Sequence, residues 1–285
     1  MRQIKRAAVL GAGVMGATIA AHLANAGLEV LLLDIVPREL TDDEQKQGLT
    51  LESPAVRSRI ARSGLEGLIK MKPAPFYLKS YSQQIEIGNF EDDAKKLKGC
   101  DWVVEVVVEN IDIKKRLFTE TVVPNLAEGA ILSTNTSGLS VNEMATVLPP
   151  EVQKNFLVTH FFNPPRYMRL LEVLGCDQTD EKLIEKMSEF LSRRLGKGVV
   201  YAKDTPNFIA NRIGVYAMYN GMHHMVEMGL SVEEVDAVAG PATARPKSAV
   251  FRTADLVGID TLVHVANNSY DLLSDDEERE MFRIP

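Results

Sequence analysis

GAGVMG, residues 11–16, lies between an apolar run at residues 7–10 and a helix-like segment at residues 17–26. A short apolar run of this kind is typical of a strand buried in a parallel sheet. The glycine spacing is typical of a tight turn from a strand into a helix whose N-terminus attracts phosphate charge. The stretch therefore predicts a strand, a turn and a helix that bind the pyrophosphate of a dinucleotide. An ordinary strand-to-helix turn is the alternative for the glycine pattern taken alone.

Each glycine of this turn has an expected role. Gly11 allows the sharp exit from the strand, Gly13 lets the backbone approach the pyrophosphate, and Gly16 lets the helix pack closely on the sheet. Val14 and Met15 stand between them at the start of the helix. We therefore expect all five residues to line the cofactor site.

The next apolar run, at residues 29–34, ends in an acid, Asp34. An acid at the end of the second strand, about 20 residues past the glycines, can accept hydrogen bonds from a ribose diol and repels a 2′-phosphate. With strand, helix, second strand and acid all in place, the dinucleotide interpretation is favoured. We expect the cofactor to be NAD rather than NADP.

Composition limits the class of protein. The chain has 285 residues, of which 45% are hydrophobic, so it can bury a large core and exceeds the usual size of one domain. Its formal net charge of -7 argues against nucleic acid as the main partner, because a phosphate backbone requires a basic surface. These values are typical of an enzyme with two domains.

Cysteine usage and hydropathy indicate the cytoplasm. The only cysteines, Cys100 and Cys176, lack the paired spacing of a metal site, so we expect no metal and a reducing compartment. No apolar run approaches the roughly 20 residues needed to cross a bilayer. The first strand begins almost at the N-terminus, which leaves no room for a signal peptide. We therefore expect a cytoplasmic protein without a membrane span.

Strand-like and helix-like segments alternate up to about residue 203. This alternation predicts an α/β fold, with a doubly wound, mostly parallel sheet of the Rossmann type and helices on both faces. The expected strands are residues 7–10, 29–34, 84–88, 102–107, 131–135, 156–161, 170–174 and 199–203. The expected helices are residues 15–26, 112–126, 140–148 and 179–195.

Strand signals end at this point, and the remaining sequence is helical in character. Thr205 and Pro206 are favoured at the N-cap and first position of a helix, and Gly229 is a typical C-terminal stop. Further helices are expected at residues 231–238, 248–256 and 259–273. We therefore expect a Rossmann-type NAD-binding domain at residues 1–203 and a smaller all-helical domain at residues 204–285.

Residues 35–83 separate the second and third strands by far more than a simple crossover requires. We expect a helical excursion from the sheet. It carries four basic side chains that could serve a substrate: Arg57, Arg59, Arg62 and Lys70. Either they form the solvated face of a helix, or they dock a phosphorylated handle of the substrate.

Polar side chains lie in or directly after the later strands, at the edge where doubly wound sheets bind ligands. Ser137 follows one strand, and His160 lies near the end of the next. Glu172 stands within an apolar run, where a buried carboxylate is unfavourable without a partner. A His160–Glu172 pair would supply that partner and raise the basicity of the imidazole. Each of these residues alone has a structural alternative.

The first helix of the second domain carries another candidate. Asn211 lies three residues after Phe208 and four before Val215, so we expect it to share their inward face. Helical domains of this kind commonly pair through apolar faces, and we expect a homodimer. The residues considered for that contact, or alternatively for the internal core, are Met218, Met222, Met225 and residues 262–266.

Taken together, these segments resemble one enzyme family. GAGVMG, VVEVVVEN, STNTSGLS, THFFNPP, LLEVLG and DTPNFIANR occur here in the same order as in 3-hydroxyacyl-CoA dehydrogenases, and they span nearly the whole chain. The resemblance implies an NAD-dependent enzyme of fatty-acid beta-oxidation. The implied reaction interconverts 3-hydroxyacyl-CoA and 3-ketoacyl-CoA by hydride transfer.

The resemblance also implies the roles of individual residues. His160 matches the catalytic base, Glu172 matches its orienting partner, and Ser137 and Asn211 match residues that hold the substrate oxygen and support catalysis. The matched residues at the cofactor site are Asp34, Glu109, Lys114 and, near the nicotinamide and the substrate, Asn163.

Residues 240–260 are more similar to long bacterial fatty-acid oxidation proteins, in which this unit precedes an enoyl-CoA hydratase-like region. The chain is therefore either complete or truncated, in which case it is a piece of a longer polypeptide. Two other functions also stay open. One is an NAD-dependent dehydrogenase of a free 3-hydroxy acid, and the other is a non-catalytic, crystallin-like NAD-binding protein.

Overall fold

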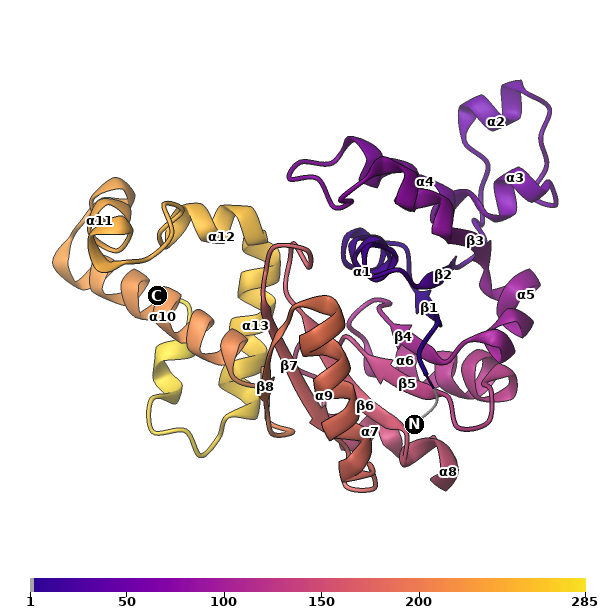
Figure 1. The fold of residues 1–285 in the computed structure, drawn as a ribbon. Helices are drawn as coiled ribbons and strands as arrows, with labels where there is room; N and C mark the ends of the chain where they lie inside the picture. Colours follow the sequence, from indigo (N-terminus) through magenta and orange to yellow (C-terminus); the bar gives the residue numbers. More distant parts are fainter. Residues whose placement is uncertain (1–2) are drawn as a thin grey trace. The chain divides into compact units, whose positions relative to one another are not determined.

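The computed structural model describes residues 3–285, except for the side chains of Thr261 and His264. Residues 1 and 2, part of the N-terminus where no signal peptide is expected, lie outside the described residues. The chain separates into two compact units. The first, called here the sheet unit, runs to Thr136 and resumes over 140–204, while the helical unit comprises 137–139 and 205–285 (Figure 1).

The sheet unit is built on one sheet of eight strands in the order β3-β2-β1-β4-β5-β6-β7-β8. Every neighbouring pair is parallel except β6 and β7, which are antiparallel. The prediction of a doubly wound, mostly parallel sheet is confirmed. The strands are β1 Arg6–Leu10, β2 Glu29–Asp34, β3 Ile85–Asn89, β4 Trp102–Glu105, β5 Ile131–Thr134, β6 Phe156–Phe161, β7 Leu170–Gly175 and β8 Gly198–Tyr201.

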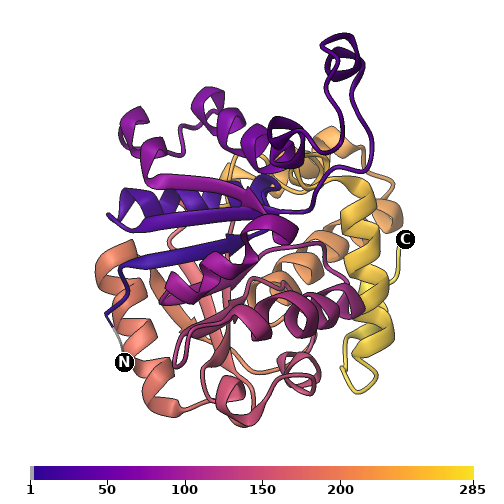
Figure 2. The same ribbon diagram turned by 90° about the vertical axis from the view of Figure 1, so that its right-hand side faces the viewer.

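Helices cover both sides of these strands, as Figure 2 shows. Side chains of α1, α4 and α9 form one core cluster with Val9, Leu32 and Trp102 of the sheet. Burial of such aliphatic and aromatic side chains is the main stabilising term of the unit. Its α-helices are α1 Val14–Asn25, α2 Asp42–Lys46, α3 Pro54–Arg57, α4 Arg59–Lys70, α5 Phe90–Asp93, α6 Ile111–Leu117, α7 Val141–Ala145, α8 Pro150–Gln153 and α9 Glu181–Leu195.

The helix predicted over residues 112–126 is shorter than expected. Only α6 is α-helical, and the chain continues through a π turn at Phe118–Val122 and a 3-10 turn at Val123–Asn125. Pro124 explains the change, because its ring removes a donor and clashes with the preceding turn of an α-helix.

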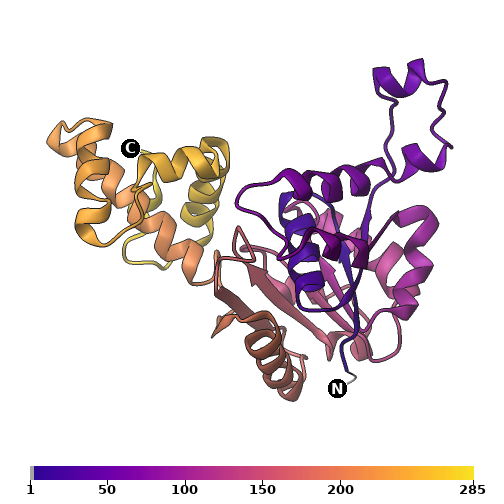
Figure 3. The ribbon, with the colours of Figure 1, turned by 45° about the horizontal axis from the view of Figure 1, so that its top comes forward.

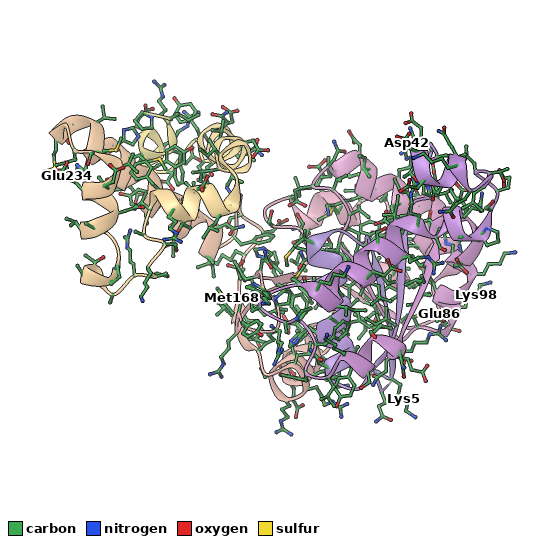
Figure 4. All side chains as sticks on the ribbon, turned by 90° about the horizontal axis from the view of Figure 1, so that it is seen from above. Lys5, Asp42, Glu86, Lys98, Met168 and Glu234 are labelled. Atoms are coloured by element: carbon green, nitrogen blue, oxygen red, sulfur yellow. The ribbon has the colours of Figure 1, made fainter. Side chains whose placement is uncertain are left out.

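The excursion between β2 and β3 contains α2, α3 and α4, and α2 and α3 project from the sheet unit in Figure 3. Figure 4 labels Asp42 of α2 at the outer edge of this unit. In α4, Ala61 and Leu68 are buried in the core. Gly64 faces the glycine turn so closely that a Cβ there would lie 2.5 Å from the Ala12 carbonyl oxygen. The excursion therefore packs one helix against the predicted cofactor turn.

The helical unit has its own core, which includes Val215, Tyr219, Ala254 and Phe282. Met218 and Met222 pack against this cluster, and Leu262 and Ala266 lie within it. For these four residues, of those considered for a dimer contact, the structure favours the internal-core alternative. The helices of the unit are α10 Ala210–Met228, α11 Val232–Val238, α12 Phe251–Val257 and α13 Ile259–Leu272.

The predicted start of the first helix in this unit is wrong. α10 begins at Ala210, because Asn207 and Phe208 have left-handed backbone angles, with φ of 59° and 48°. The predicted ends are confirmed: Gly229 is the left-handed C-cap of α10, and Ser231 forms a capping box with Glu234 at the start of α11.

The described part of the chain lacks two kinds of feature. No helix there combines the length and hydropathy needed to cross a membrane. Likewise, no group of three or more His, Cys, Asp or Glu side chains among residues 3–285 could hold a metal ion.

Candidate active site

In the glycine turn after β1, two glycines lie too close to backbone atoms to carry a side chain. Gly11 has φ of 108°, and a Cβ there would lie 2.6 Å from the Val106 carbonyl oxygen. A Cβ on Gly16 would lie 1.8 Å from the carbonyl oxygen of Gly11. Both positions therefore require glycine for the fold itself, since even one added carbon would displace backbone.

Gly13 differs from Gly11 and Gly16, because no atom of the described residues excludes a side chain there. A Cβ on Gly13 would meet no atom within 4 Å. Gly13 is the N-cap of α1, whose first turn has no side-chain cap and no acidic residue. Open space beside an uncapped helix N-terminus fits a pyrophosphate, which would contact these N–H groups. Val14, 60% exposed, lies at the same end of the helix.

Asp34 ends β2 beside this turn. Its Oδ2 accepts a hydrogen bond from the Ala12 N–H at 2.5 Å, and its Oδ1 accepts one from the Ile35 N–H at 2.6 Å. The carboxylate is thereby held next to the space at Gly13. A fixed negative charge at this place suits a ribose diol and disfavours a 2′-phosphate.

We expect Asp34→Ser to relax the preference for NAD. Loss of the charged acceptor should weaken NAD binding by about 10- to 100-fold, which corresponds to the 1.5–3 kcal/mol typical of such bonds. NADP should bind more tightly than in the parent, because the repulsion is gone. Dissociation constants for both cofactors measure the effect.

Asp34→Asn is the matched control for this variant, because an amide oxygen can still accept the Ala12 N–H bond. It should retain more NAD affinity than Asp34→Ser while losing the repulsion of NADP. Equal or better binding of NADP by the parent protein would contradict the assignment of Asp34.

The antiparallel pairing of β6 and β7 places His160 directly opposite Glu172. The His160 Nδ1 and the Glu172 Oε2 are 2.7 Å apart. His160 is 5% exposed and Glu172 is fully buried. In a neutral imidazole that donates its Nδ1–H to a carboxylate, Nε2 is the hydrogen-bond acceptor. The contact with Glu172 thus sets the roles of the two ring nitrogens in that tautomer.

The loop after His160, residues 162–169, contains Asn163 and is held by two cations that the sequence did not single out. Lys197 donates to the carbonyl oxygens of Pro165 and Met168, the second at 2.9 Å. Arg166 donates to the Phe76 carbonyl oxygen at 2.9 Å. Burial lowers the pKa of Lys197 to about 8. Met168, labelled in Figure 4, lies near the end of this loop, whose shape is fixed by these bonds.

Ser137 and Asn211 are brought together within the helical unit. The Asn211 amide Nδ2 donates to the Ser137 backbone carbonyl oxygen at 3.3 Å. Asn211 lies in the first turn of α10, whereas Phe208 precedes the helix, so the predicted shared face with Phe208 is wrong. The bond, rather than the helix face, pairs these two residues.

Comparison with known proteins matches both units. The family model described as the 3-hydroxyacyl-CoA dehydrogenase NAD-binding domain matches residues 6–205, and the model of the C-terminal domain of the same family matches residues 208–283. The chain belongs to the 3-hydroxyacyl-CoA dehydrogenase family. Its glycine turn and Asp34 thus lie in the NAD-binding domain of that family.

Relatives of this family differ in length. A probable 3-hydroxyacyl-CoA dehydrogenase of Bacillus subtilis is 53% identical over 284 residues, which is 100% of this chain and 36% of that protein. Another from Deinococcus radiodurans is 46% identical over 97% of this chain and 75% of its own length. The crystal structure of (S)-3-hydroxybutyryl-CoA dehydrogenase from Ralstonia eutropha is similar, with a TM-score of 0.75 and 28% identity over 99% of this chain and 90% of that one.

Glu109 and Lys114 are also predicted from the sequence to line the cofactor site. The Lys114 Nζ and the Glu109 Oε2 are 3.3 Å apart. Glu109 also accepts a hydrogen bond from the Thr136 hydroxyl at 2.6 Å. Lys114 is only 1% exposed and donates to both carboxylate oxygens of Glu105, at 2.7 and 3.0 Å. The Lys114 ammonium is therefore committed to a buried ion pair inside the protein.

Glu105 is the residue that sequence reasoning missed at this place. It is fully buried and also accepts hydrogen bonds from the Val107 N–H at 2.7 Å and the Thr134 hydroxyl at 2.6 Å. The signal was present, because an acid flanked by valines in a buried strand requires a partner. The same reasoning that paired Glu172 with a histidine predicts a cation for Glu105.

Two of the basic residues in the excursion are already paired. Arg57 donates to Asp92 through Nε at 2.6 Å and Nη2 at 2.9 Å, and these carboxylate bonds raise the pKa of its guanidinium. Arg59 pairs with Glu44. The other two predicted residues, Arg62 and Lys70, have exposed side chains on α4.

Proposed function

We propose that this chain catalyses the NAD-dependent interconversion of 3-hydroxyacyl-CoA and 3-ketoacyl-CoA, a step of fatty-acid beta-oxidation. The observation that carries the proposal is the buried His160–Glu172 pair, with Nδ1 and Oε2 2.7 Å apart. It occurs in a chain of the 3-hydroxyacyl-CoA dehydrogenase family. Fixed by the acid, the imidazole can exchange a proton with a secondary alcohol.

The side chains divide the chemistry between them. NAD, when bound at the glycine turn, supplies the acceptor for the hydride on C3 of the substrate. The Nε2 of His160 accepts the proton of the C3 hydroxyl, and Glu172 stabilises the imidazolium that results. In the reverse direction the same imidazolium returns its proton to the forming alkoxide. Proton movement at C3 therefore depends on one nitrogen of one residue.

Ser137 and Asn211 are proposed to hold the oxygen on C3, and Asn163 to lie near the nicotinamide and the substrate. A hydroxyl and an amide can both donate to that oxygen, and fixing it aligns the carbon for hydride transfer. Under this proposal the Rossmann-type domain, residues 1–203, and the helical domain, residues 204–285, both contribute to catalysis. Arg62 and Lys70 are the proposed contacts to the phosphates of CoA.

The test is NADH oxidation with acetoacetyl-CoA and, separately, with free acetoacetate. We expect turnover of the thioester and little or none of the free acid, because the basic side chains of α4 recognise the CoA phosphates. Equal turnover of free acetoacetate would indicate a free 3-hydroxy acid dehydrogenase instead. NAD binding without turnover of either would indicate a non-catalytic protein.

The setting of this activity is also proposed. The chain spans 36% of the B. subtilis relative, and we propose that it acts in a longer cytoplasmic polypeptide with an enoyl-CoA hydratase-like region. We propose a homodimer through the helical domain. Mass measurement in solution tests the dimer, and a monomeric mass at micromolar concentration would contradict it. Comparing turnover with that of a longer version shows whether residues 1–285 complete the site.

A further inference from the structure

Two segments distant in the sequence, residues 137–142 and 204–211, are joined at three places. The first is the carboxylate of Asp204. Its Oδ1 accepts the Val141 N–H at 2.9 Å, and its Oδ2 accepts the Ser140 hydroxyl at 2.8 Å and the Asn142 N–H at 3.0 Å. Three bonds to one carboxylate fix the last residue before the helical segment against the start of α7.

The second and third places lie within the helical unit. A Cβ on Gly138 would lie 2.6 Å from Oδ1 and 3.0 Å from the backbone nitrogen of Asn207, so only glycine allows this approach. Asn207 itself is fixed, since its Nδ2 donates to the Ser269 hydroxyl at 2.6 Å. The third is the 3.3 Å bond from Asn211 to the Ser137 carbonyl. The two segments are thus held in one register.

Asp204 and Ser140 cap α7 together. The Ser140 hydroxyl accepts the Glu143 N–H at 3.1 Å, and the Asp204 carboxylate accepts the N–H groups of Val141 and Asn142. Asp204 adds a charge from a residue far along the chain, immediately before the turn that leads to Asn211. Its contacts therefore also serve the placement of one segment against the other.

We propose that Asp204 is a positioning residue that sets the separation of Ser137 and Asn211, with Gly138 as the spacer that lets their segments meet. The inference rests on the proposed function, because it gives these two residues a common substrate oxygen. Asp204 acts through them and is not assigned any contact with substrate or cofactor.

Asp204→Asn tests the proposal, and Asp236→Asn is its matched control. Asp236 makes the same kind of cap on α12, accepting the N–H groups of Val250 at 3.0 Å, Phe251 at 2.8 Å and Arg252 at 3.1 Å. Both variants should lower the melting temperature. Only Asp204→Asn should also lower kcat with acetoacetyl-CoA, by about 10- to 100-fold, the loss typical of a misplaced reacting group, with NAD affinity unchanged.

A double-mutant cycle supplies the second measurement. In an Asn211→Ala background, Asp204→Asn should lower kcat by less than about twofold, because the side chain that it positions is gone. Should Asp204→Asn fail to fold, Ser140→Ala removes one of the three bonds and should give a smaller loss of kcat in the same direction.

Equal losses of kcat in the Asp204 and Asp236 variants would overturn the proposal, as would an equal effect of Asp204→Asn in both backgrounds. A parent protein that binds NAD but does not turn over acetoacetyl-CoA would count against the proposed function instead. The two failures are therefore distinguishable.

Discussion

His160→Ala is expected to lower turnover of acetoacetyl-CoA by about 10²- to 10⁴-fold, the range typical of a positioned general acid and base. The imidazole of His160, buried opposite Glu172, is the group proposed to exchange the proton with the substrate, and an alanine side chain has no group that can do so. NAD affinity should change little, because the glycine turn follows β1 and Asp34 ends β2, whereas His160 lies in β6. Steady-state kinetics and NAD titration of the same preparation measure both effects.

Two further variants identify the cause. Glu172→Gln retains the shape of the pair but cannot compensate an imidazolium charge, so turnover should also fall, by less than in His160→Ala. The control is His224→Ala, which removes an exposed histidine paired with Glu227 at 3.2 Å on α10. It should leave kcat unchanged. A folded His160→Ala protein with most of its activity would show that another base acts.

The glycine turn could be predicted from sequence because its constraints are local. A side chain on Gly11 or Gly16 would meet backbone atoms of the turn itself or of the adjoining strand end, whereas Gly13 borders open space. Each glycine of the motif therefore has a local steric reason. The His160–Glu172 pair could also be predicted, since a buried acid in an apolar strand requires a partner. Neither inference needed the position of any distant segment.

The start of α10 could not be predicted in the same way. Thr205 and Pro206 carry a strong local signal for a helix start. Tertiary contacts override it, because Asn207 packs against Gly138 and bonds to Ser269, with a left-handed backbone that no α-helix contains. Local propensity is a weak determinant where a distant segment fixes the backbone.

The basic residues show the same limit. The sequence shows the positive charge of Arg57 and Lys114 but not the carboxylates that meet them from elsewhere in the chain. In the folded protein Arg57 pairs with Asp92, and Lys114 pairs with Glu105. A charge that resembles a ligand contact in sequence is then a structural ion pair, and only the folded geometry separates the two.

Lys114→Met is expected to lower the free energy of unfolding by about 3–5 kcal/mol, the cost typical of removing one partner of a buried ion pair. Glu105 is fully buried, and without Lys114 it loses the cation that bonds both of its carboxylate oxygens, while the bonds from the Val107 N–H and the Thr134 hydroxyl remain. Methionine fills most of the volume of the lost side chain, so the effect reports the charge. Denaturant unfolding of parent and variant measures it.

Lys115→Met is the matched control, because Lys115 follows in the same helix and pairs with the exposed Glu143 at 2.9 Å. It should cost less than about 1 kcal/mol, as exposed ion pairs do. In a Glu105→Gln background, Lys114→Met should cost less than it does alone, since no uncompensated carboxylate remains. Lys114→Met could instead unfold like the parent but bind NAD far more weakly. That result would show that Lys114 contacts the cofactor and does not stabilise the fold through its ion pair with Glu105.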